Sequence, residues 1–196
     1  MHISNQLEQI FGTSDFGDGL FNKWPIGIRF ELGADWGNAP HHFYTQRFYQ
    51  AIDRAKTILQ EIFKNTQNLH VILTFTNQST LEAKILVKDL INCGFTLPDK
   101  YVLNSNAGII FNDKITSANT HAILWAIISN EIGVKPTAQI KAYFIDLEKA
   151  IVAHPYDDRG MDVIAIDKDN LLPIYNKFGA WILDYDKEKI DKTFSS

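Results

Sequence analysis

Three short apolar runs in the last third of the sequence constrain the fold more than any other feature. They occupy residues 142–147, 150–156 and 161–166, and they are separated only by Glu148-Lys149 and by residues 157–160. Connections this short join antiparallel strands, whereas parallel strands need a long crossover. The sequence therefore predicts an antiparallel meander in this region.

Apolar residues that recur at helical spacing predict helices in other parts of the chain. The predicted helices cover residues 3–11, 41–64, 79–93 and 118–132, and two more begin at Asp169 and Asp186. Ser79 and Glu82 have the spacing of a capping box, which fixes the start of the third helix. In the second helix, one apolar stripe marks the face that packs on the core: Phe48, Ile52, Ala55, Leu59 and Ile62.

Further strands are predicted at residues 26–32, 69–75 and 108–111, while residues 12–25 and 95–106 are predicted to be loops. In the first of these strands, Ile28, Phe30 and Leu32 alternate and are expected to face the core. The order of elements predicts an α+β fold with a mixed, largely antiparallel sheet packed with helices. The C-terminal strand meander is followed by two helices, and residues 1–196 are expected to form a single domain.

The acidic balance of the chain narrows the expected partners. The 23 Asp and Glu residues exceed the 19 Lys and Arg residues, so the formal net charge is −4. Nucleic acid is not expected as the principal partner, because its phosphates repel an acidic surface. A basic protein partner is compatible with this charge.

No segment is expected to enter a membrane. The longest apolar run, residues 122–128, is far shorter than the roughly 20 residues that a spanning helix needs. The first residues lack a basic stretch followed by an apolar block, so no secretory signal is expected. Cys93 is the only cysteine and is expected to be a small core residue. A cytoplasmic protein is the resulting expectation.

The densest polar cluster lies at the second turn of the predicted meander. Its candidate binding residues are Tyr156, Asp157, Asp158, Arg159 and Asp162. On one interpretation they form a recognition tip, in which carboxylates attract a basic partner and the arginine and tyrosine supply contacts. On the other they form a hairpin whose polar groups serve the turn itself, with Arg159 paired to Asp162.

A second candidate segment is Trp181-Ile182-Leu183-Asp184-Tyr185-Asp186. Asp184 and Tyr185 join the candidate binding residues, because this segment would enlarge the acidic surface if it folds beside the turn. Asp186 is expected to be the N-cap of the last helix, and Trp181 to belong to the core. Arg29 and Glu31 are expected on a solvated or paired face of the first strand.

No recognised catalytic or cofactor motif is present, and no cofactor is expected. His41 and His42 are adjacent rather than one helical turn apart, so they do not have the spacing of a zinc site. Gly17 and Gly19 precede no lysine, so they do not form a phosphate-binding loop.

Residues 26–33, 156–165 and 181–186 resemble a bacterial family that is known as domain of unknown function 3885. The resemblance is most specific in the last third, where the hairpin, the leucine-containing helix and the block from Trp181 to Asp186 occur in the same order. The resemblance implies a single bacterial cytoplasmic domain and transfers no catalytic residue.

Two hypotheses of function remain from the sequence. The first is a protein-binding module, specifically an immunity-type protein that neutralises a basic toxin. The second is a small hydrolase or transferase with Asp157, Asp158 or Asp184 as general base and Arg159 as a stabiliser of anionic charge.

Overall fold

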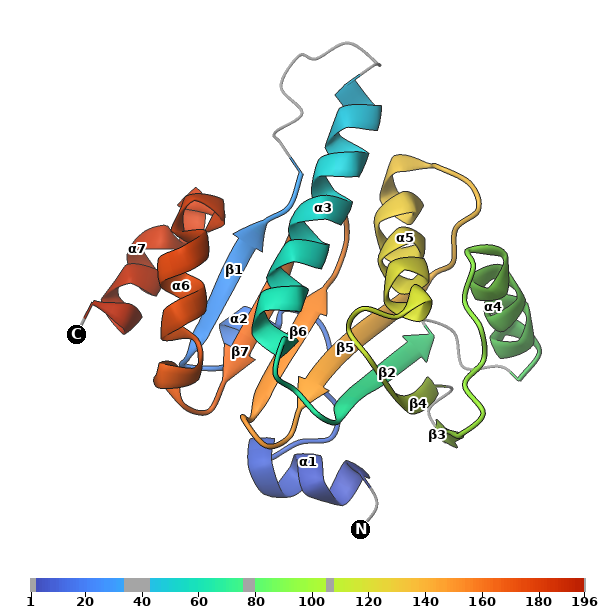
Figure 1. Cartoon of the computed structure of the whole chain (residues 1–196), viewed down its shortest axis with the longest axis horizontal. Helices are drawn as coiled ribbons and strands as arrows, with labels where there is room; N and C mark the ends of the chain where they lie inside the picture. The colour runs from blue at the N-terminus through green and yellow to red at the C-terminus, as the bar shows by residue number, and fades with distance from the viewer. Residues whose placement is uncertain (1–2, 34–42, 76–79, 105–107, 196) are drawn as a thin grey trace.

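The computed structural model describes residues 3–33, 43–75, 80–104 and 108–195, and its centre is one seven-stranded sheet (Figure 1). The strands follow the order β1-β7-β6-β5-β2-β4-β3, and every pairing is antiparallel. Their bounds are β1 Gly27–Glu31, β2 Leu69–Phe75, β3 Tyr101–Asn104, β4 Gly108–Asp113, β5 Ile140–Asp146, β6 Ile151–Pro155 and β7 Gly160–Ala165. The predicted α+β class and the C-terminal meander β5-β6-β7 are confirmed.

Helices pack on both faces of this sheet. Their bounds are α1 Ile3–Phe11, α2 Leu20–Lys23, α3 Phe43–Phe63, α4 Thr80–Asn92, α5 Ala118–Ile132, α6 Leu172–Phe178 and α7 Asp184–Phe194. Two short 3₁₀ turns, η1 Lys168–Asn170 and η2 Gly179–Trp181, flank α6. None of the helices in the described parts of the chain is long and apolar enough to cross a bilayer.

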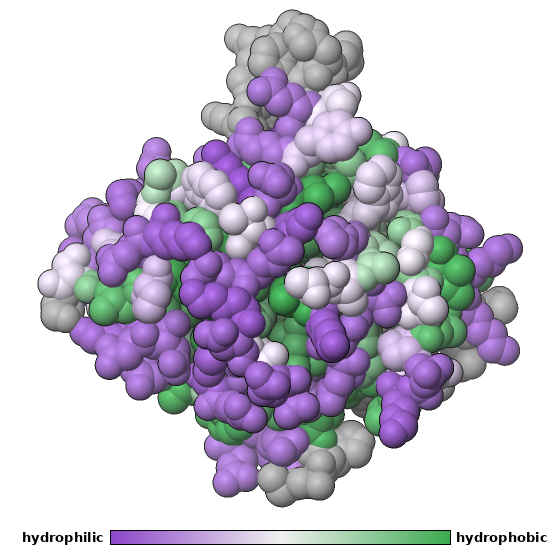
Figure 2. Space-filling model, in the orientation of Figure 1, coloured by the Kyte–Doolittle hydropathy of each residue, from purple (hydrophilic) through white to green (hydrophobic). Residues whose placement is uncertain are grey.

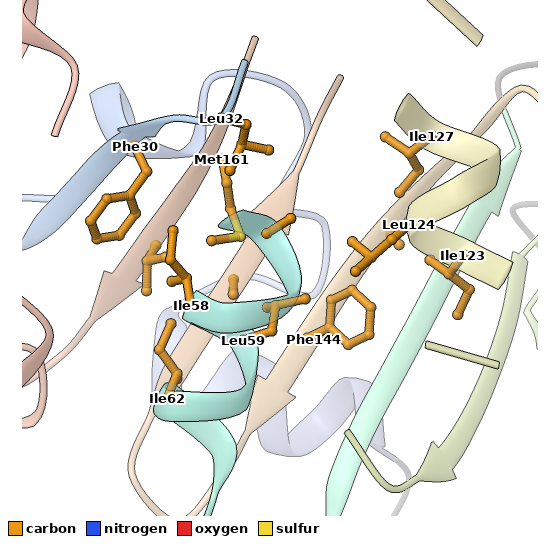
Figure 3. Close-up of a cluster of buried hydrophobic side chains, with 14 of the residues drawn as sticks. Phe30, Leu32, Ile58, Leu59, Ile62, Ile123, Leu124, Ile127, Phe144 and Met161 are labelled. Atoms are coloured by element: carbon orange, nitrogen blue, oxygen red, sulfur yellow. The ribbon is translucent and has the colours of Figure 1, made fainter. Parts of the chain in front are cut away.

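The larger core lies between one face of the sheet and helices α3, α5 and α6. Helix α3 supplies Leu59 and Ile62 of the predicted stripe together with Ile58, and α5 supplies Ile123, Leu124 and Ile127 (Figure 3). These side chains meet three fully buried residues of the sheet: Phe30, Phe144 and Met161. Burial of these apolar side chains is the main stabilising contribution to the fold.

A smaller core covers part of the opposite face. Helix α1 places Leu7 and Phe11 against this face, and Phe16 from the following loop packs beside Phe11 and Tyr143. The sheet residues of this core alternate with those of the larger one, as expected for a sheet that is buried on both faces: Ile72, Ile110, Tyr143, Ile145, Val152 and Ile164.

Helix α5 shows how local sequence defines an element. The Ser117 side chain accepts a hydrogen bond from Thr120 N at its start. At its end, Gly133 adopts a left-handed conformation (φ 75°) and its N–H donates to Ser129 O. The predicted bounds of this helix, residues 118–132, are therefore confirmed.

Two predicted loops contain regular structure. Residues 12–25 include the short helix α2, and residues 95–106 include the strand β3, so both predictions were wrong in these segments. The strand was missed because Pro98 and Asp99 precede it and Asn104 ends it, and residues of these types indicate a turn. Pairing with β4 supplies hydrogen bonds that this local pattern does not reveal. The predicted capping residue Ser79 lies outside the described residues.

The two edges of the sheet differ. At the β1 edge, a bridge between Phe30 and Ile182 and a hydrogen bond from Leu183 N to Arg29 O (2.9 Å) attach the C-terminal segment to the strand. Strand β3 forms the other edge and pairs with β4 on one side. In the described part of the chain, only the β1 edge is therefore covered by backbone pairing.

Candidate functional site

The candidate binding residues of the 156–162 segment lie where β6, β7 and β1 meet. Strands β6 and β7 pair so that His154 is opposite Asp162, and Arg29 of β1 is opposite Asp162 on the other side. These three residues therefore lie side by side across one face of the sheet. The register of three strands, rather than proximity in the sequence, builds this cluster.

Asp162 is the centre of a buried ion pair. Its side chain is 1% exposed and accepts hydrogen bonds from Arg29 Nε (2.7 Å), Arg29 Nη2 (3.2 Å) and Phe21 N (2.9 Å). The hydrogen bond and charge of Asp162 raise the pKa of Arg29 well above its ordinary value. This carboxylate therefore joins β7, β1 and α2 within the fold.

Asp186 belongs to the same ion-pair cluster. Its Oδ2 accepts a hydrogen bond from Arg29 Nη1 (3.1 Å). Helix α7 begins at Asp184 and its N-cap is Leu183, so the prediction of Asp186 as N-cap was wrong. The carboxylate points to the sheet because Arg29 provides a partner there.

The ring of Phe21 packs against two cations of the same region, with Arg29 Cζ 4.9 Å and Lys189 Nζ 4.3 Å from its centre.

Within the turn between β6 and β7, Arg159 forms hydrogen bonds with Asp157. Asp157 Oδ1 accepts from Arg159 N (2.7 Å), and Asp157 Oδ2 accepts from Arg159 Nε (2.8 Å) and Nη2. The guanidinium of Arg159 therefore pairs with Asp157, and the predicted pairing of Arg159 with Asp162 is not formed. Asp157 also raises the pKa of Arg159 through this hydrogen bond.

Asp158 connects the turn to α3 and β1. Its side chain is 2% exposed and accepts a hydrogen bond from Arg47 Nε of α3. Its backbone O accepts from Gly33 N (2.9 Å), and the neighbouring Arg159 O accepts from Leu32 N (2.9 Å). The turn thus fastens the end of β1 and the long helix at one corner of the molecule.

An aromatic row beside Asp162 was not predicted from the sequence. His154 stacks on Tyr143 with ring centres 4.4 Å apart, and Tyr156 follows at 6.2 Å. His154 Nδ1 lies 2.8 Å from Ala142 O, and burial lowers the pKa of this imidazole. Burial raises the pKa of Tyr156, and the charge of Asp162 acts in the same direction. His154 lies on β6 and Tyr156 directly follows its end, and their alternate positions in the sequence are the signal that places both on this face.

Tyr156 is half-buried, and the structure separates the other sequence-predicted residues into two groups. Asp157, Asp158 and Asp162 are buried and paired with arginines. Arg159, Asp184 and Tyr185 keep exposed side chains, and Tyr185 is 90% exposed. The three buried carboxylates stabilise the fold and do not form an exposed acidic patch.

We expect Gly160→Ala to lower the free energy of unfolding by about 1–3 kcal/mol, because the corner has no room for a methyl group. An added Cβ would lie 2.1 Å from Tyr156 Oη and 2.8 Å from Phe30 O. The tyrosine can rotate, but Phe30 O belongs to the backbone of β1. Urea denaturation measures the change. The control is Gly179→Ala, where nothing lies within 4 Å of the added Cβ, and a loss of equal size there would contradict this explanation.

Within the residues that the structure describes, no group of side chains forms a site for metal or thiol chemistry. No group of at least three His, Cys, Asp or Glu side chains there could hold a metal ion. Cys93 is partly buried and packs against the larger core, and burial raises the pKa of its thiol. The adjacent histidines at positions 41 and 42 lie outside the described residues.

A groove of about 870 Å³ runs beside the edge strand β3. Its lining is Ile3, His70, Pro98, Asp99, Lys100, Tyr101, Val102, Ile110, Phe111 and Asn112. Burial lowers the pKa of the His70 imidazole. The groove thus combines an apolar lining with a few polar groups.

Exposed apolar side chains gather at the same end of the sheet. Five large apolar residues between positions 85 and 102 are at least one-third exposed: Ile85, Ile91, Leu97, Tyr101 and Val102. Figure 1 places α4 and β3 together at this end, and Figure 2 shows apolar residues at the surface over α4. Large exposed apolar groups that gather in this way are typical of interaction surfaces.

The fold and the ion pairs at the β6–β7 turn define a small α+β protein with one antiparallel sheet and an internal charge cluster. The chain belongs to the family described as Domain of unknown function (DUF3885), whose profile matches residues 3–186. It is also similar to the Uncharacterized protein YnaE of Bacillus subtilis (strain 168), with 20% identity over 210 residues that cover 94% of this chain and 99% of that protein. No solved structure matches the chain.

Proposed function

We propose that this protein binds another protein, and that the β3 edge receives an extended segment of the partner. The observation that carries the proposal is the difference between the two sheet edges. The C-terminal segment covers β1, whereas within the described residues β3 pairs with β4 alone and carries the exposed side chains of Tyr101 and Val102. An edge strand of this kind is a template for the addition of a further strand.

The groove beside β3 supports the same proposal. In strand addition, main-chain hydrogen bonds supply affinity, and pockets for alternate side chains supply specificity. Val102 and Ile110 face the groove from paired strands, and Ile3 of α1 faces it from the other side. A partner segment with apolar side chains at alternate positions fits this lining. Lys100 and Asp99 at the same groove offer one charge of each sign.

A toxin is the partner class that we propose within this function. The formal net charge of −4 supports attraction of a basic partner during encounter. Co-expression with the product of a toxin-like gene next to its own gene tests this part. Restored growth of the host is the expected result, and failure to restore growth together with failure to bind the toxin would exclude the immunity role.

Binding at the β3 edge is tested by selection from a displayed library of random peptides. The wild-type protein is expected to enrich extended sequences with alternating apolar residues, and Val102→Lys is expected to lose at least about 90% of that binding, because an edge lysine opposes strand addition. Val102 is 47% exposed, so the fold tolerates the lysine, and circular dichroism verifies this.

The matched control for this selection is Tyr185→Ala. Tyr185 lies on α7, which packs beside the opposite edge strand, and its side chain is 90% exposed. Unchanged peptide binding by this variant is expected. If Tyr185→Ala abolishes binding and Val102→Lys does not, the interface lies at the C-terminal segment, where the sequence placed Asp184 and Tyr185.

A further inference from the structure

A second cleft, of about 420 Å³, lies between the C-terminal half of α4 and the segment that leads from α5 into β5. Its lining is Leu86, Asp89, Asn92, Asn130, Lys135, Pro136, Thr137, Ala138 and Gln139. Its volume falls within the range of small-molecule sites. Unlike the groove beside β3, this cleft is lined mainly by polar side chains.

Apart from Thr137, the polar side chains of this cleft have no partner among the residues that the structure describes. Among the residues that the structure describes, no hydrogen bond or ion pair involves the side chains of the following five lining residues: Asp89, Asn92, Asn130, Lys135 and Gln139. Asp89 and Asn130 are half-buried, whereas Asn92, Lys135 and Gln139 are exposed. Groups in this state gain from a ligand that replaces the remaining water with hydrogen bonds.

The wall of the cleft is held in place from behind. Pro136 O accepts hydrogen bonds from Trp125 Nε1 (2.8 Å) and Ser129 Oγ (3.3 Å), and Thr137 Oγ1 donates to Ala126 O (3.1 Å). Three side-chain hydrogen bonds therefore fix the segment to α5. A ligand meets a wall that is already ordered, which reduces the entropy lost on binding.

From this arrangement we propose that the cleft binds a small, neutral ligand rich in hydroxyl groups, of the monosaccharide class. The three carboxamides each donate and accept, Asp89 accepts, and Lys135 donates. A hydroxyl group also donates and accepts, so neighbouring hydroxyls match this mixed set. The charges of Asp89 and Lys135 cancel, which favours a ligand without net charge. Leu86 and Pro136 offer apolar contact to the C–H groups of a sugar ring.

The test is an NMR titration of the labelled full-length protein with a panel of neutral monosaccharides. The Trp125 indole N–H is the reporter, because its acceptor Pro136 O belongs to a residue that lines the cleft. We expect a saturable shift of this signal with at least one sugar of the panel. For Asn130→Ala we expect about tenfold weaker binding, because a half-buried amide that bonds the ligand is lost.

The control variant is Asn112→Ala, which changes an amide in the groove beside β3 and is expected to leave the sugar affinity unchanged. A spectrum of native dispersion verifies that each variant is folded. The proposal is overturned if no sugar produces a saturable shift of the Trp125 signal. It is also overturned if Asn130→Ala binds as tightly as the wild type, or if zwitterionic amino acids bind in place of sugars.

Discussion

Asp162→Ala is expected to lower the free energy of unfolding by about 3 kcal/mol, because it removes one partner of a buried ion pair. The substitution deprives Arg29 Nε, Arg29 Nη2 and Phe21 N of their acceptor at once. Asp186 still pairs with Arg29, whose side chain is 17% exposed, so the loss stays at the lower end of the range for buried pairs. Urea denaturation followed by circular dichroism measures this change.

The matched control is Asp184→Ala, which removes an exposed carboxylate two residues before Asp186. Its effect is expected to stay within about 0.5 kcal/mol, because exposed surface groups contribute little. Asp162→Asn keeps the shape of the side chain but loses its charge, and an intermediate loss is expected. If Asp162→Ala and Asp184→Ala destabilise the protein equally, the buried pair does not have the stabilising role assigned to it.

Phe144→Ala is expected to destabilise the protein by about 4 kcal/mol, through lost burial and the cavity left behind. Phe144 is fully buried on β5 between α3 and α5, where Leu59 and Leu124 lie close to it (Figure 3). For a chain of this size the melting temperature is expected to fall by about 10 °C. Differential scanning calorimetry measures the fall, with Tyr185→Ala as an aromatic truncation at an exposed position.

The same calorimetric scan tests the proposal that the chain is a single domain. The larger core includes side chains from β1, the central strands and helices α3 to α7, so loss at Phe144 is expected to shift one cooperative transition as a whole. Two transitions, of which only one responds to Phe144→Ala, would contradict a single domain.

Local pattern predicted most of the fold. Ile28, Phe30 and Leu32 were expected to face the core, and all three are fully buried. The helical period and the stop at Gly133 gave the bounds of α5. In these segments the spacing of the apolar residues indicates which face of the helix or strand is buried, so sequence and structure agree. Strand β3 was missed because its four residues depend on β4 for their pairing rather than on their own pattern.

The proximity of the carboxylates at the β6–β7 turn was predictable from the sequence, but their partners were not. The sequence showed that Asp157, Asp158 and Asp162 are close together, but not which groups would face them. Arg29 lies 133 positions from Asp162, and Arg47 lies 111 positions from Asp158. Because these arginines approach through strand register and helix packing, carboxylates expected at an exposed tip became internal ion pairs.

The sequence by itself thus determined the α+β class, the antiparallel meander and the core-facing residues, since each follows from periodicity over a few neighbouring residues. Only the tertiary structure decided which polar side chains are buried with partners and which edge of the sheet the C-terminal segment covers. Those outcomes depend on contacts between segments far apart in the chain. The covered β1 edge and the polar cleft beside α4 both arise in this way.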